Sequence, residues 1–81
     1  MNEIIKQAEA LGYKLYIDDD FTVVTPLDRE SFTAEVHKGY RGPWGVQTSS
    51  YGLASTQDID MVIDGLKRAS ELAELLNDAG L

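Results

Sequence analysis

The sequence predicts a small α+β domain in which two helices pack on one face of a four-stranded antiparallel sheet, in two layers. Apolar residues recur at helical spacing near both ends of the chain and alternate at strand spacing between them. The segments between these patterns are short and rich in Gly, Pro and Asp, which is typical of turns. We expect one domain over residues 1–81, because a chain of 81 residues is too short to divide into two cores.

The first helix is predicted over residues 2–11. Asn2 is a suitable cap, and Gly12 stands where a helix commonly ends. Ile4, Ala8 and Leu11 fall at positions i, i+4 and i+7 and form one apolar face. A helix of this length is marginal in water, so we expect its apolar face to dock on the sheet.

A β-hairpin is predicted next, from strands over residues 13–17 and 21–25. Their side chains alternate, with Tyr13, Leu15 and Ile17 on one face of the first strand. The polar run Asp18–Asp20 predicts the turn between them. Pro26 is expected to end the second strand, since proline cannot donate to a ladder.

Two further strands complete the predicted sheet, which has one apolar and one polar face. The third is predicted over residues 31–38, and the fourth begins at Trp44 or Val46 and runs to about Tyr51. The segment 39–45 between them contains three Gly and one Pro, so it is predicted to be a loop.

The final helix is predicted over residues 56–79, and residues 55–58 resemble a capping box. Gly65 within it indicates a close approach to the sheet. Met61, Leu72 and Leu75 flank the main stripe, and they either widen the core face or form a partner or dimer surface. The main apolar stripe is expected at Ile59, Val62, Ile63, Leu66, Ala69, Ala73 and Leu76.

Composition limits the possible functions. The chain has no Cys, which excludes disulfides and thiolate metal sites and favours an intracellular compartment. It has 14 acidic and 7 basic residues, and a net charge of −7 argues against direct binding to nucleic acid. That charge suits a basic partner, or it serves only solubility. With no membrane span or signal peptide in the pattern, we expect a cytoplasmic protein.

The sequence carries no catalytic, metal or cofactor motif, so we expect neither an enzyme nor a cofactor. The single histidine, His37, would lie beside Glu35 on a strand, whereas a nucleophile and its base must converge. The Asp18–Asp20 run lacks the spacing of a calcium-binding loop. Solvated carboxylates in a hairpin turn are the simpler interpretation.

Two groups of residues are candidates for binding. The loop after the third strand places Lys38 and Arg41 beside aromatic residues, a combination enriched at binding hot spots and able to stack on a base. The alternative is that its Trp folds back onto the core. The final helix carries an acidic face, which is either solvated or imitates the phosphates of nucleic acid. The candidate binding residues are Lys38, Tyr40, Arg41, Trp44, Asp60, Asp64 and Glu71.

The segment SSYGLASTQDID, residues 49–60, together with the long helix after it, resembles small proteins encoded in phages and prophages of Gram-positive bacteria. The resemblance covers roughly residues 46–79. The size, acidity and lack of Cys also resemble anti-CRISPR and other anti-defence proteins. The resemblance implies a non-enzymatic protein that binds a host or phage factor, and it assigns no functional residue.

Three functions follow as hypotheses. The first is an accessory or inhibitor protein that binds a larger partner in the host cytoplasm, with nucleic-acid mimicry as one mechanism. The second is a dimer that binds a nucleotide or small ligand near Arg41 and Trp44. The third is a structural protein that self-associates through Met61, Leu72 and Leu75. No membrane partner is expected.

Overall fold

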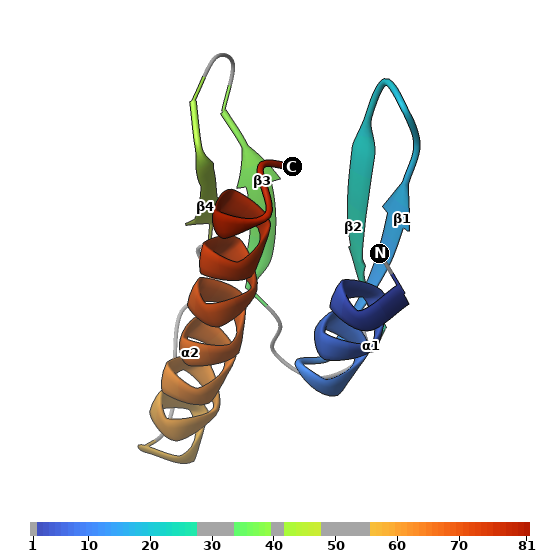
Figure 1. The fold of residues 1–81 in the computed structure, drawn as a ribbon. Helices are drawn as coiled ribbons and strands as arrows, with labels where there is room; N and C mark the ends of the chain where they lie inside the picture. The colour runs from blue at the N-terminus through green and yellow to red at the C-terminus, as the bar shows by residue number, and fades with distance from the viewer. Residues whose placement is uncertain (1, 28–33, 40–41, 48–55) are drawn as a thin grey trace.

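The computed structural model describes residues 2–27, 34–39, 42–47 and 56–81. It confirms the predicted α+β class, with a helix at each end and antiparallel strands between them (Figure 1). The predicted strand positions 31–33 and 48–51, and the capping residues of the final helix, lie outside the described residues or side chains. The elements in order are α1 (Asn2–Ala10), β1 (Tyr13–Ile17), β2 (Thr22–Pro26), β3 (Glu35–Lys38), β4 (Trp44–Gln47) and α2 (Thr56–Asp78).

Both helices end at the predicted glycines. Gly12 and Gly80 have φ angles of 95° and 74°, a conformation that side chains other than hydrogen disfavour. At the end of α2, the N–H of Leu81 donates to the carbonyl of Leu76 at 3.1 Å, and that of Gly80 donates to Asn77 at 3.1 Å. This pair of bonds is a Schellman motif, which satisfies carbonyls that the helix leaves free.

Hydrogen bonding among the described residues divides the strands into two antiparallel hairpins, β1 with β2 and β3 with β4. The predicted pairing within each hairpin is present, but in the part of the chain that the structure describes the two hairpins are not joined into one four-stranded ladder. In the first hairpin Leu15 lies opposite Val24, and Tyr16 lies opposite Val23. β2 lies beside β3, so the hairpins are neighbours in space (Figure 1).

β2 ends at Pro26, as predicted, and the proline is itself the last residue of the strand, paired with Tyr13. The N–H of Leu27 donates to the carbonyl of Gly12 at 3.0 Å, so the pair next to Tyr13–Pro26 is hydrogen-bonded. Hydrogen-bonded and non-hydrogen-bonded pairs alternate along an antiparallel ladder, so Tyr13–Pro26 is a non-hydrogen-bonded pair. Such a pair needs no N–H from the proline. The missing donor is on the β3 side of β2, which disfavours a ladder between these two strands.

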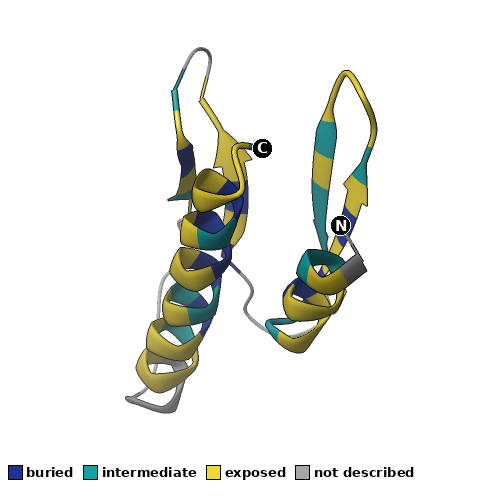
Figure 2. Cartoon of the chain, viewed as in Figure 1, coloured by how far each residue is buried: buried dark blue, intermediate teal, exposed yellow. Residues whose placement is uncertain are grey.

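The core lies between the helices and the hairpins. α1 packs against β1, and α2 packs against β3 and β4. Figure 2 places the buried residues of α2 along one side of the helix and leaves the opposite side exposed. The buried hydrophobic residues are Ala8, Tyr13, Leu15, Ala34, Val36, Trp44, Ala69, Leu72, Ala73 and Leu76.

Two side-chain hydrogen bonds connect the first half of the fold to the second in the described residues. The hydroxyl of Tyr13, on β1, donates to the carbonyl of Ala34, just before β3. The guanidinium of Arg68, on α2, donates to the carbonyl of Leu11 at 3.2 Å. Burial raises the pKa of the Tyr13 hydroxyl, and the positive charge of Arg68 partly offsets this effect.

The buried stripe of α2 differs from the predicted one. Leu72 is fully buried, so it is a core residue and not part of a partner surface. Ile59 and Ile63 are each 45% exposed, although they were predicted to face the core. α2 has 23 residues and spans about 34 Å. The described strands have at most five residues, which reach about 17 Å, so the start of α2 extends beyond them.

Candidate binding surface

The outer face of the β1–β2 hairpin carries exposed large hydrophobic residues. Tyr16 and Phe21 are each 53% exposed, and Val23 is 44% exposed. The rings of Tyr16 and Phe21 lie with their centroids 5.9 Å apart and their planes tilted by 33°. Because the pleat points alternate residues to opposite faces, Leu15 and Val24 face the core while Tyr16 and Val23 face away from it. We call Tyr16, Phe21, Val23 and the turn Asp18–Asp20 the tip surface.

The turn of this hairpin adds three exposed carboxylates to the tip surface. The N–H of Asp18 donates to the carbonyl of Phe21 at 2.8 Å and closes the hairpin. The carboxylate of Asp18 accepts the N–H of Asp19 at 2.6 Å and the hydroxyl of Tyr16 at 3.4 Å. The predicted turn is present, and the Asp18 side chain stabilises it, while Asp19 and Asp20 are exposed to solvent.

A hollow of about 350 Å³ separates this turn from the second half of the fold. Asp18, Asp19, Asp20 and Phe21 lie on its hairpin side, and Lys38 and Trp44 lie on the opposite side with the last two residues of the chain. The ammonium of Lys38 donates to the carbonyl oxygen of Leu81 at 2.7 Å. The structure thus brings two of the predicted binding residues, Lys38 and Trp44, to the same hollow as the turn Asp18–Asp20. We call this site the tip hollow.

Trp44 forms part of the core, as the simpler interpretation of the loop predicted. It is 7% exposed, and its indole Nε1 has no hydrogen-bond partner in the described part of the chain. Asn77 of α2 holds its backbone on both sides. The N–H of Trp44 donates to Asn77 Oδ1 at 2.8 Å, and Asn77 Nδ2 donates to the Trp44 carbonyl at 3.2 Å. The indole is therefore a fixed wall of the tip hollow.

The other predicted binding residues either lie outside the described residues or are not among those that line this hollow. Tyr40 and Arg41 lie outside the described residues. Asp60, Asp64 and Glu71 are exposed on α2, and helical spacing puts them on the side away from its buried residues. The carboxylate of Asp64 accepts a hydrogen bond from the guanidinium of Arg68 at 3.0 Å, so the acidic face is partly neutralised there.

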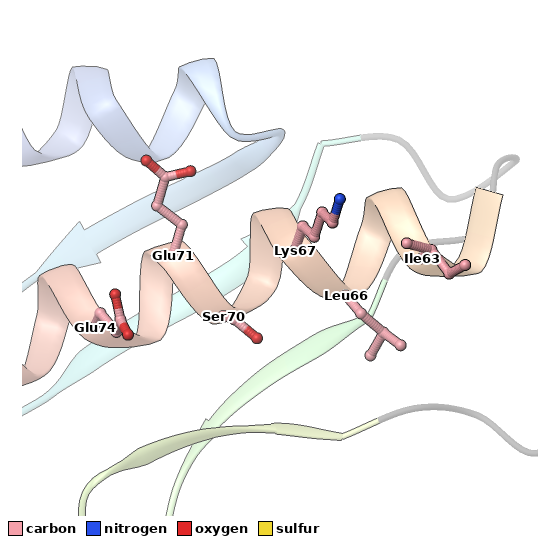
Figure 3. A pocket seen from close by; sticks show the side chains of 6 residues that line it. All are labelled: Ile63, Leu66, Lys67, Ser70, Glu71 and Glu74. Atoms are coloured by element: carbon pink, nitrogen blue, oxygen red, sulfur yellow. The ribbon is translucent and has the colours of Figure 1, made fainter. Parts of the chain in front are cut away.

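A second hollow, of about 380 Å³, runs along α2 (Figure 3). In Figure 3 the Glu71 side chain points to one side of the helix, and Leu66 and Ser70 point to the other. Its lining mixes apolar side chains with both signs of charge, so it indicates no ligand class. The six residues that line it are Ile63, Leu66, Lys67, Ser70, Glu71 and Glu74.

His37 does not form a catalytic arrangement with the described residues. Its Nε2 lies 2.9 Å from a carboxylate oxygen of Glu35, and both side chains are more than half exposed. The predicted side-by-side position of these two residues on a strand is confirmed. Across the described ranges, no group of three or more His, Cys, Asp or Glu residues is placed to hold a metal ion.

Tyr16, Phe21 and Val23 were not among the candidate residues predicted from the sequence. The signal was present in the hairpin register: a two-residue turn at Asp19–Asp20 pairs Leu15 with Val24 and so places Tyr16 opposite Val23. With Leu15 in the core, the large apolar residues of the other face must be exposed.

Neither helix of the described chain is both long enough and apolar enough to span a bilayer. Comparisons of the chain with protein families, with curated proteins and with solved structures each gave no match.

Proposed function

We propose that this chain is a non-enzymatic binding protein that acts in the host cytoplasm as a phage-type accessory or inhibitor, by occupying the surface of a larger, basic protein. The tip surface is its contact. The observation that carries the proposal is the exposure of Tyr16, Phe21 and Val23 together on one face of a hairpin. Single exposed apolar residues are common, but a contiguous group beside charged residues is typical of interaction sites.

Charge supports a basic partner. The chain has a net charge of −7, and the three carboxylates of the turn lie beside the exposed rings. An arrangement with apolar contacts at the centre and charges at the rim is common in protein interfaces. The rim charges would mainly raise the association rate, so binding should weaken as salt screens them.

A capture experiment tests the proposal. Tagged protein is incubated with host lysate at low and high salt, and bound proteins are identified by mass spectrometry. We expect a basic partner that binds the wild type, binds less at high salt, and is lost with the Tyr16→Ala/Phe21→Ala double variant. Leu27→Ala is the matched control, because Leu27 is 55% exposed at the other end of the same hairpin. Equal capture by the double variant and the control would contradict the proposal.

Nucleic-acid mimicry by α2 is a second candidate mechanism. It is favoured by the exposure of Asp60, Asp64 and Glu71 on one helix. Reversing these three charges to Arg should abolish capture of a nucleic-acid-handling partner, whereas Glu9→Arg, at an exposed site on α1, should not. Normal capture after the triple reversal would end the mimicry hypothesis and leave the tip surface as the contact.

A further inference from the structure

We propose that a groove between the start of α1 and the end of α2 binds an amphipathic helix of the basic partner. The apolar side of that helix enters the groove, and its lysine or arginine residues lie at the rim. The inference rests on the proposed function for the nature of the partner, and it adds a second contact. Both helices pack on the core side of the hairpins, whereas the tip surface faces away from the core, so the two contacts can be tested separately.

The groove lies where the two helices are next to each other but not packed together. The end of α1 is held to the middle of α2, because the guanidinium of Arg68 donates to the Leu11 carbonyl at 3.2 Å. The start of α1 and the end of α2 are instead separated by a hollow of about 550 Å³, which we call the helix groove. Such a volume is within the usual range of ligand sites, roughly 300–1,000 Å³.

Apolar side chains that are only partly covered line the helix groove. Ile4 on α1 and Leu75 on α2 lie on its two sides, and Leu81 lines it as well. Each of the three is partly exposed, although Ile4 and Leu81 pack against the buried core. Leu75 was predicted either to widen the core face or to form a partner surface, and its place in the groove favours the partner surface. Covering such side chains is the main source of affinity when a helix binds in a groove.

Charge decides which occupant fits the helix groove. Among the described residues that line it, both charged side chains are acidic and exposed: Glu3 on α1 and Asp78 on α2. A basic amphipathic helix can place its apolar stripe between these helices while its cations lie near a carboxylate on each of them. A second copy of this chain is disfavoured, because it would bring a further net charge of −7 to the same carboxylates.

A synthetic peptide tests the groove without the partner. The probe has about 14 residues of Leu and Lys, with leucine at helical spacing. The intact chain is titrated with this peptide, and NMR follows the methyl groups of Ile4 and Leu75. We expect saturable shifts there and none at Leu27, which is 55% exposed on the first hairpin. A peptide of the same composition without helical spacing, and one with Glu in place of Lys, should each bind at least tenfold more weakly.

Paired variants separate the groove from the general charge of the protein. Glu3→Gln/Asp78→Asn should weaken binding of the Leu–Lys peptide at least fivefold at low salt, because it removes both carboxylates of the groove. Glu9→Gln/Asp60→Asn is the matched control, since it removes one exposed carboxylate from each helix outside the groove. The control should weaken binding by no more than twofold. An unchanged amide spectrum outside the substituted turns verifies the fold of each variant.

Equal losses in the two double variants, equal binding of the Glu peptide, or no saturable shift at the groove methyl groups would each overturn the inference. So would shifts of these groups when the protein is concentrated alone, because a second copy would then cover the groove. Partner capture that depends on Tyr16 and Phe21 but not on Glu3 and Asp78 would overturn the inference while the proposed function stood. Capture with the opposite dependence would support the groove and contradict the tip surface as the contact.

Discussion

Gly12 offers a direct test of how the two halves of the fold are joined. Its φ of 95° is strained for any other residue, and a left-handed conformation costs an L-residue about 1–2 kcal/mol. A Cβ added there would lie 2.7 Å from Nη1 of Arg68. Arg68 would have to move and lose its bond to the Leu11 carbonyl, which is worth about 1 kcal/mol at this partly exposed site. We therefore expect Gly12→Ala to lower the free energy of unfolding by about 2–3 kcal/mol.

Urea denaturation followed by circular dichroism measures this change, and Gly80→Ala is its control. Gly80 has a similar φ of 74°, but an added Cβ would meet nothing within 4 Å. Its substitution should cost only the backbone strain, about 1 kcal/mol. In an Arg68→Ala background the extra cost of Gly12→Ala should disappear. If Gly12→Ala and Gly80→Ala have equal effects in the wild type, the contact with Arg68 does not constrain the fold.

Further substitutions test the core. Asn77→Ala removes both hydrogen bonds to the Trp44 backbone and should cost about 1–3 kcal/mol of unfolding free energy in urea. Leu72→Ala should lower the free energy of unfolding by about 2–5 kcal/mol, because Leu72 is fully buried. Leu75 is only partly buried, so Leu75→Ala should lower it clearly less. Equal losses for the two variants would refute the assignment of Leu72 to the core. The raised pKa of Tyr13 means that the folded state holds this proton more tightly than the unfolded state. Its stabilising effect is therefore complete below pH 10.0 and is lost as pH rises above that value, and Tyr13→Phe should remove this part of the alkaline loss in stability.

Local patterns were sufficient to predict the type and order of the elements. Glycine at positions 12 and 80 marks both helix ends because few other residues adopt a positive φ. The alternation of Tyr13 and Leu15 with polar neighbours gave the buried face of β1. These signals act within a few residues, so they need no knowledge of the rest of the fold.

Features that depend on distant contacts could not be predicted in this way. The periodicity of α2 cannot indicate how far the strands extend beneath it, so Ile59 and Ile63 were wrongly placed in the core. Whether Pro26 can itself belong to the strand depends on which pairs of the ladder are hydrogen-bonded. The tip hollow brings residues 18–21 together with Lys38, Trp44 and the last residues of the chain, and no spacing in the sequence records that proximity.

The two hydrogen bonds from Asn77 have a consequence for solubility. The unpaired N–H and carbonyl groups of an edge strand can form hydrogen bonds with a strand of another molecule, and this pairing is a common first step of aggregation. At Trp44 both groups are already occupied by one amide side chain, as a neighbouring strand would occupy them. Asn77 thus acts as a blocking group on β4, and a variant that folds without it should aggregate at lower protein concentration than the wild type.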